Sequence, residues 1–132
     1  EARKMQEEKR NWVIKTYRDL DVYVLSFEMA MKIFELTKKF PKEETSSLTD
    51  QIRRSSRSIP ANIAEGWAKR RYKDVFLRHL NEASGSCEET KVWLDFSLKS
   101  KYITENEYNQ LKKEYDRIGA MLFSLTIKWR KF

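Results

Sequence analysis

The sequence predicts an all-α protein folded as an antiparallel up-down-up-down four-helix bundle. Only 3 Gly and 2 Pro occur among the 132 residues, so the chain has few residues that break helices. Apolar residues recur every three or four positions in four stretches of about 20 to 28 residues, as helices with one buried face require. Short polar links between the stretches make consecutive helices run in opposite directions.

The first helix is expected from Asp21 to about Phe40, where Pro41 ends it. Its core positions follow helical spacing: Val22, Leu25, Met29, Ile33, Leu36 and Phe40. A second apolar line lies on another side of the same helix: Tyr23, Phe27, Ala30 and Phe34. One helix face cannot use both lines, so we expect the second to pack on a neighbouring helix or on another subunit.

The second helix is expected to begin after an N-cap at Ser46 or Ser47 and to carry a buried stripe. The stripe comprises Leu48, Ile52, Ile59, Ile63 and Trp67, with Ser55 and Ser56 filling its gap. Pro60 falls inside this pattern and removes one backbone hydrogen bond, which forces a kink or a break. We favour a continuous helix with a kink, in which Asn62 bonds a carbonyl that Pro60 leaves free.

The end of the second helix has two interpretations. Gly66 can serve as its C-terminal cap, or the helix can continue to about Lys69. On a helical projection Arg53, Arg54 and Arg57 lie away from the apolar stripe and face outward.

The third helix is expected from about Lys73 to Ser100 and the fourth from Thr104. Small residues from Ala83 to Cys87 permit close approach of another helix. Thr104 and Glu107 match a capping box. The third helix buries Phe76, Leu80, Ala83, Cys87, Thr90 and Leu94, and the fourth buries Tyr108, Leu111, Tyr115, Ile118, Leu122, Leu125 and Trp129. The fourth helix has more apolar surface than one interface between helices can bury, because it also carries Met121, Phe123 and Ile127.

Residues 1–16 form a charged N-terminal extension, and residues 17–132 form the bundle domain. No apolar stretch approaches the ~20 residues that a membrane-spanning helix needs. The single cysteine, Cys87, cannot form an internal disulfide, which fits a reducing compartment but would also fit a secreted chain without disulfides. A cytoplasmic location without membrane association is therefore the prediction.

The net charge of +7 is concentrated in one segment. Residues 51–80 hold eight basic and two acidic residues, a local net charge of +6, so the other 102 residues contribute +1. The basic residues are Arg53, Arg54, Arg57, Lys69, Arg70, Arg71, Lys73 and Arg78. Such a cluster suits phosphate backbones, because each neutralised phosphate releases condensed counterions. The alternative is a solvated helix face.

No catalytic or metal-binding arrangement can be assembled from the sequence. His79 is the only histidine, and with Cys87 it lacks the partners and spacing of a zinc site. The sequence lacks a Gly-rich phosphate loop and a Ser-His-Asp arrangement. We therefore expect no enzymatic activity, no metal and no cofactor.

Several stretches resemble the four-helix bundle family that includes proteins encoded in intervening sequences of bacterial 23S ribosomal RNA genes. The matching stretches are YRDLDV at 17–22, LTKKFP at 36–41, LTDQIRRS at 48–55, SIPANIAEG at 58–66 and YITE at 102–105. The same family contains the accessory variability proteins of diversity-generating retroelements, which GSCEETKVWLD at 85–95 resembles. The chain departs from the family at Tyr72-Lys73-Asp74, where many relatives place a serine.

The resemblance implies a homopentamer of four-helix protomers that binds nucleic acid through a basic surface and partners a reverse transcriptase. We therefore predict a non-enzymatic accessory protein that binds RNA or DNA through the eight basic residues named above. The predicted oligomer interface comprises Tyr23, Phe27, Phe34, Phe123 and Ile127. The alternative is a structural adaptor whose basic surface docks an acidic protein, with no role in nucleic-acid binding.

Overall fold

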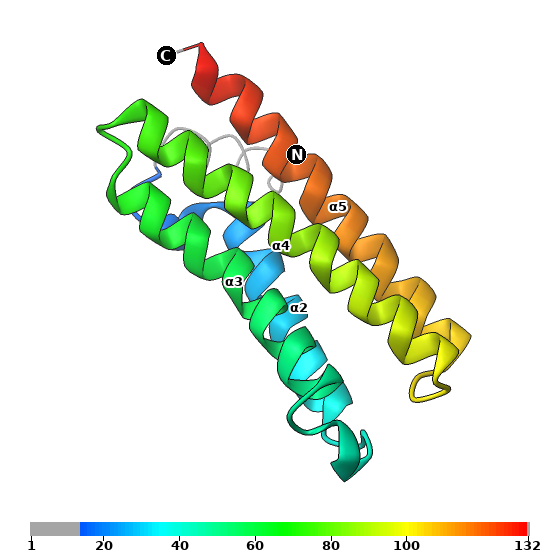
Figure 1. Ribbon diagram of the computed structural model, residues 1–132. Coiled ribbons are helices and arrows are strands. Elements are labelled where there is room, and N and C mark those ends of the chain that lie inside the picture. The colour runs from blue at the N-terminus through cyan, green and yellow to red at the C-terminus, as the bar shows by residue number, and fades with distance from the viewer. Residues whose placement is uncertain (1–13, 132) are drawn as a thin grey trace.

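The computed structural model describes residues 14–131, which form four long α-helices (Figure 1). These are α2 (Asp21–Thr37), α3 (Leu48–Ala68), α4 (Lys73–Lys99) and α5 (Glu105–Arg130). Two 3-10 turns, η1 (Tyr17–Asp19) and η2 (Lys42–Glu44), precede α2 and α3. The part of the chain that the structure describes contains no strand, so the predicted all-α class is confirmed.

Consecutive helices pack against one another in opposite directions. Asn62 of α3 meets His79 of α4, whereas the earlier Ser55 meets the later Thr90, so residue numbers fall along α4 as they rise along α3. The interface between α3 and α4 is the most extensive of the bundle, and contacts between α2 and α5 close the ring of helices. The two grooves described below flank α2 on either side of this ring.

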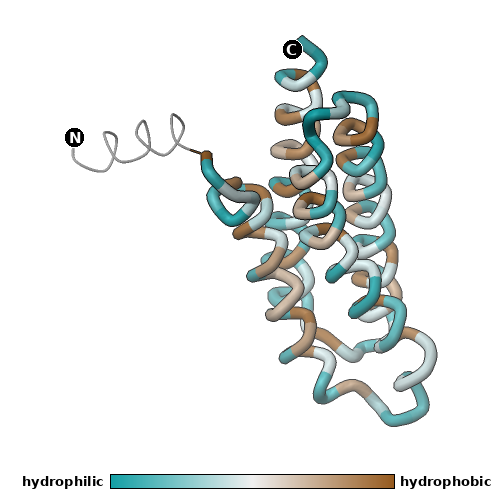
Figure 2. Tube along the Cα trace, turned by 90° about the vertical axis from the view of Figure 1, so that its left-hand side faces the viewer, coloured by the Kyte–Doolittle hydropathy of each residue, from teal (hydrophilic) through white to brown (hydrophobic). Residues whose placement is uncertain are grey.

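Most of the core positions that the helical periodicity predicts are buried, but five of them are only partly buried: Leu25, Leu36, Tyr108, Leu125 and Trp129. Every predicted stripe position of α3 and α4 is buried, and Tyr115, Ile118 and Leu122 of α5 are fully buried. Ser55 and Ser56 are buried as well and fill the gap in the stripe of α3. Figure 2 shows the resulting alternation of apolar and polar segments along each helix.

The motif SIPANIAEG packs α3 against α4. Ser58 Oγ accepts a hydrogen bond from Ser86 Oγ at 2.9 Å, and Asn62 Oδ1 lies 3.0 Å from His79 Nδ1. Asn62 Nδ2 donates to the carbonyl oxygen of Ser58 at 3.0 Å. The expected bond to the carbonyl that Pro60 leaves free is therefore wrong, because Asn62 reaches back one turn and across to α4 instead.

Gly66 lies inside α3 and is not its C-terminal cap, because the helix continues to Ala68 with Lys69 at the cap position. A Cβ atom at Gly66 would lie 2.7 Å from His79 Cβ and 3.0 Å from Phe76 Cδ1. The absence of a side chain therefore lets α4 approach. The helix is also continuous through Pro60, as predicted, while a kink at that residue stays a prediction.

The helix ends depart slightly from the expected ones. Thr104 and Glu107 form the predicted capping box. Ser47 is the N-cap residue of α3 but donates its hydroxyl to Glu44 Oε1 at 2.6 Å, and Glu44 caps the Leu48 N–H at 3.4 Å. The helix α2 ends at Thr37, three residues before Phe40, because Pro41 disfavours helical geometry in the residue before it.

The predicted N-terminal extension lies mostly outside the described residues. Within the described part, Thr16 caps η1 in a capping box with Asp19. No helix among residues 14–131 has the length and hydropathy needed to cross a membrane.

Candidate functional site

The structure separates the eight predicted basic residues into two groups. Arg53, Arg54 and Arg57 lie in the first half of α3, whereas Lys69, Arg70 and Arg71 lie in the turn after it. At the 1.5 Å rise of a helix, Arg57 and Arg70 are roughly 20 Å apart along the axis. The two groups therefore lie at different levels along the axis of α3.

Within the first group, Arg53 is engaged by the protein itself, whereas Arg54 and Arg57 are exposed. Arg53 is half-buried. Its Nε donates a hydrogen bond to Thr37 Oγ1 at 2.8 Å and so contacts the last turn of α2. Arg54 pairs with Asp50 at 3.0 Å. The guanidinium groups of Arg57 and Arg53 both lie over the Phe34 ring, at 5.6 and 4.7 Å from its centre, respectively. The projection that places Arg53 outward fails because the neighbouring helix offers it oxygen acceptors.

The second group meets the last turn of α5. Lys73 Nζ donates to the carbonyl oxygen of Arg130 at 2.6 Å. The ring of Trp129 contacts Trp67 and Phe76 at centroid distances of 5.7 and 4.7 Å. Figures 1 and 2 show the α3–α4 turn and the end of α5 at the same end of the bundle.

The contact between the α3–α4 turn and the end of α5 adds three basic residues that the sequence interpretation did not include. Together the two segments form what we call the basic end: Lys69, Arg70, Arg71, Lys73, Arg78, Lys128, Arg130 and Lys131. The sequence does contain a signal for the added residues: no acidic residue follows Asp116, so the charged residues after it are all basic. In an antiparallel bundle, the end of α5 lies beside the turn between α3 and α4.

Few carboxylates oppose these charges. Residues 65–78 and 128–131 contain eight basic residues and two acidic ones, Glu65 and Asp74. Glu65 Oε2 pairs with Lys69 at 3.3 Å and lies 3.2 Å from His79 Nε2. The Lys69 and Glu65 side chains are about half exposed, and surface pairs of this kind are weak. The basic end therefore keeps a formal net charge of +6.

Aromatic rings support the arginines of this surface. Arg70 lies 4.3 Å from the centre of the Trp67 ring and donates from Nη1 to the Trp67 carbonyl oxygen at 2.9 Å. Arg71 lies 5.2 Å from the ring centre of Tyr72, which is exposed. Stacking on aromatic rings restrains guanidinium groups while leaving most of their N–H donors available.

Residues 18–124 match the family described as 23S rRNA-intervening sequence protein. The chain belongs to this family. A crystal structure of a protein of unknown function from the S23 ribosomal protein family of Bacteroides thetaiotaomicron VPI-5482 is similar, with 31% sequence identity and a TM-score of 0.73. The similarity covers 80% of this chain and 94% of that chain. The comparison with curated proteins gave no significant match.

The family match spans the four helices but stops before the last turn of α5. The α3–α4 turn therefore lies within the region shared with the family, whereas Lys128, Arg130 and Lys131 lie beyond it. The basic end is thus formed partly by residues inside the range matched to the family and partly by residues beyond that range.

The residues predicted to form an oligomer interface lie on two sides of the bundle. Tyr23, Phe27 and Phe34 belong to α2, where Tyr23 and Phe27 line a groove of about 320 Å³ against α3. Phe123 of α5 lines a separate groove with Leu77 of α4. Phe27 and Phe123 are 48% and 67% exposed, whereas Phe34 is half-buried beneath arginines.

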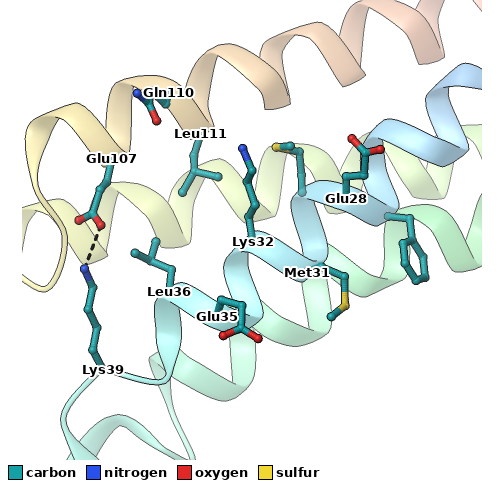
Figure 3. A pocket seen from close by; sticks show the side chains of 11 residues that line it. Glu28, Met31, Lys32, Glu35, Leu36, Lys39, Glu107, Gln110 and Leu111 are labelled. Carbon is teal, nitrogen blue, oxygen red and sulfur yellow. Dashed lines mark hydrogen bonds and ion pairs between the residues drawn. The ribbon is translucent and has the colours of Figure 1, made fainter.

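A third groove, of about 730 Å³, runs between α2 and α5 and is also lined by Phe27 (Figure 3). Met31 and Leu36 line it together with Leu111, and Lys39 pairs with Glu107 at 2.9 Å across its end. Exposed Val24 and Met31 extend the apolar ridge of α2. The sequence interpretation did not include them among the interface residues.

The only histidine and the only cysteine take part in helix packing. His79 lies between Asn62 and Glu65, and Cys87 Sγ donates to the carbonyl oxygen of Tyr115 at 3.2 Å. Burial raises the pKa of the Cys87 thiol to about 11, which disfavours its nucleophilic thiolate form. Residues 14–131 contain no group of His, Cys, Asp and Glu arranged to hold a metal ion.

Proposed function

We propose that the protein binds the phosphate backbone of nucleic acid through the basic end. The observation that supports this proposal is the contact between Lys73 and Arg130, which joins the α3–α4 turn to the last turn of α5. The resulting surface holds eight basic and two acidic residues. Cations gathered in this way bind polyanions because each phosphate contact releases counterions.

The binding is independent of nucleotide sequence. The basic end is formed by a turn and a helix terminus, and it presents no long helix that could enter the major groove with its side chains. Contacts to phosphates position a nucleic acid without reading its bases. RNA and DNA are both candidate ligands on this basis.

The role that we propose is binding rather than catalysis. His79 and Cys87, the side chains best suited to proton transfer and nucleophilic attack, are engaged in the packing of α3, α4 and α5. Membership of the 23S rRNA-intervening sequence protein family agrees with a non-enzymatic role connected with RNA genes.

The protein also assembles into a closed homo-oligomer in this proposal. Exposed apolar residues lie on α2 (Phe27 and Met31), on α5 (Phe123) and also on α4 (Val92 and Phe96). Two different patches on one protomer are what a head-to-tail ring requires, because each subunit offers one patch to each neighbour. A pentamer and a reverse transcriptase partner follow from the likeness to the accessory proteins of diversity-generating retroelements.

The nucleic-acid proposal is tested by charge reversal at the basic end. The variant carries Arg70→Glu, Arg71→Glu and Lys128→Glu, and binding of a fluorescent single-stranded RNA is followed by anisotropy at several salt concentrations. The wild-type protein should bind less tightly as salt rises, with a log-log slope that counts its phosphate contacts. The variant should lose at least about tenfold in affinity, with a shallower slope.

A matched control changes the same net charge elsewhere. Its substitutions are on exposed lysines of other segments: Lys42→Glu, Lys99→Glu and Lys113→Glu. The control should retain most of the affinity. Equal loss in both variants would show attraction to net charge alone, and absence of RNA and DNA binding in the wild type would favour an adaptor for an acidic protein.

The assembly is tested by sedimentation velocity. Phe27→Glu and Phe123→Glu each place a charge on one of the two apolar patches, so either change should shift the protein to smaller species. Val92→Glu is the control, because Val92 is an equally exposed apolar residue, at 47%, on α4. A monomeric wild type would overturn the oligomer proposal.

A further inference from the structure

We infer that Tyr72 stacks on an unpaired nucleotide base, so that the basic end prefers single-stranded to double-stranded nucleic acid. This inference rests on the proposed function and names the form of ligand that the same surface takes. Four observations carry it.

The first observation is that Tyr72 is available. It is 61% exposed, and it is the only tyrosine among the described residues that is classed as exposed. The phenol groups of Tyr102 and Tyr108 donate to Glu44 and Asp95. The Tyr72 hydroxyl makes no hydrogen bond with the described residues. Its ring therefore contributes little to the core and is free to contact a ligand.

The second observation is that the backbone beneath the ring is held in place. Tyr72 is the N-cap residue of α4. Its N–H donates to the Lys69 carbonyl oxygen at 3.0 Å, and its own carbonyl oxygen accepts from Val75 and Phe76 at 3.0 and 3.1 Å. A tyrosine on a fixed backbone has only two side-chain torsions to order, so stacking costs little conformational entropy.

The third observation is the positive charge beside the ring. The Arg71 guanidinium lies 5.2 Å from the ring centre, and Lys73 follows Tyr72 directly in the chain. The nearest acidic residue in the sequence is Asp74, two positions after Tyr72. An exposed aromatic ring on a basic surface is the arrangement that binds single strands, with bases on the ring and phosphates on the cations.

The fourth observation is that the other rings at this end are committed to packing. Trp67 is 7% exposed and Phe76 is fully buried. Trp129 is half-buried and contacts both rings. Among the residues that the structure describes, Tyr72 is therefore the aromatic residue of the basic end whose face a base can reach.

These features favour an unpaired strand for a physical reason. Bases inside a duplex are already stacked on their neighbours, so a protein ring gains contact only with bases that are unpaired or at an end. Cations bind the phosphates of both forms. The difference in affinity between the two forms should therefore come from Tyr72.

The experiment compares a short RNA strand without self-complementarity with the same strand annealed to its complement. Anisotropy is measured at one salt concentration for the wild type, Tyr72→Ala and Tyr72→Phe. Tyr72→Ala should weaken single-strand binding by roughly 5- to 100-fold, the range found for loss of one stacked base, and change duplex binding less than about twofold. Tyr72→Phe keeps the ring and should keep the wild-type preference.

The salt dependence separates this inference from the proposed function. Tyr72→Ala should leave the salt slope unchanged, because no phosphate contact is lost. If charge reversal at the basic end abolishes binding while Tyr72→Ala alters neither RNA form, the stacking inference is wrong and the proposed function stands. If charge reversal changes nothing, the proposed function is wrong as well.

Discussion

Gly66 of α3 lies against His79 of α4 at a distance that only glycine permits. A Cβ atom at position 66 would be 2.7 Å from His79 Cβ, closer than two such atoms can approach without moving. Earlier along α3, Asn62 contacts His79 and Ser58 accepts a hydrogen bond from Ser86, and both contacts also join α3 to α4. The approach of the two backbones therefore sets the geometry of the α3–α4 interface, and with it the position of the basic end.

Gly66→Ala should destabilise the protein by about 1–3 kcal/mol, because the added methyl group forces α3 and α4 apart. The matched control is Gly85→Ala. Gly85 lies in α4 with no atom within 4 Å of its added Cβ, so alanine should stabilise the helix by about 0.5–1 kcal/mol. Urea unfolding followed by circular dichroism measures both. Equal effects of the two substitutions would contradict the close-approach account.

Thr104→Ala should cost about 1 kcal/mol of folding free energy, since the Thr104 hydroxyl accepts the Glu107 N–H at 3.1 Å at the start of α5. Thr45→Ala is the control, because Thr45 is exposed and its side chain makes no hydrogen bond with the described residues. Urea titrations of the two variants should differ accordingly. A smaller loss for Thr104→Ala than for Thr45→Ala would show that the cap is unimportant.

The Cys87 thiol should resist alkylation in the folded protein. Its pKa of about 11 leaves on the order of one thiolate per thousand molecules at about pH 8, and its side chain is fully buried. Labelling by a disulfide reagent should therefore follow unfolding and accelerate in urea. An added cysteine at the exposed position 100, Ser100→Cys, should react at once. Equally rapid labelling of both thiols would refute the buried position.

Acid should weaken the contact between α4 and α5. Hydrogen bonds from Lys91 and then Lys112 hold the pKa of Asp116 below its ordinary value. A carboxyl group with a lower pKa in the folded state adds stability above its unfolded pKa and loses it as pH falls through the folded one. The urea midpoint should thus decrease between about pH 5 and pH 3, and Asp116→Asn should flatten that decrease. An unaltered pH profile in the variant would exclude this pair as a cause.

The helices and their buried faces could be predicted because the signals are local. The capping box at Thr104 and Glu107 uses residues three apart, and the stripe from Ile52 to Trp67 repeats with the helical period. Such patterns depend on bonds within one helix and on burial of one side. They require no knowledge of which helix lies opposite.

The candidate site could be predicted only in part, because its geometry depends on contacts between distant segments. Arg53 is drawn toward Thr37, and Lys73 is held by Arg130, 57 residues away in the chain. Neither contact has a signal within its own helix. The basic residues of the α3–α4 turn could be predicted because they cluster in the sequence. The three basic residues at the end of α5 come to lie beside them through the packing of Trp129.

By itself, the sequence determined an all-α bundle, its helix boundaries to within a few residues and the location of its excess charge. Tertiary structure alone decided which arginines are used to hold helices together and which gather at the basic end with α5. The physical reason is that periodicity and capping act over one or two helical turns. A charged side chain, by contrast, takes its role from whatever acceptor or ring another helix brings within reach.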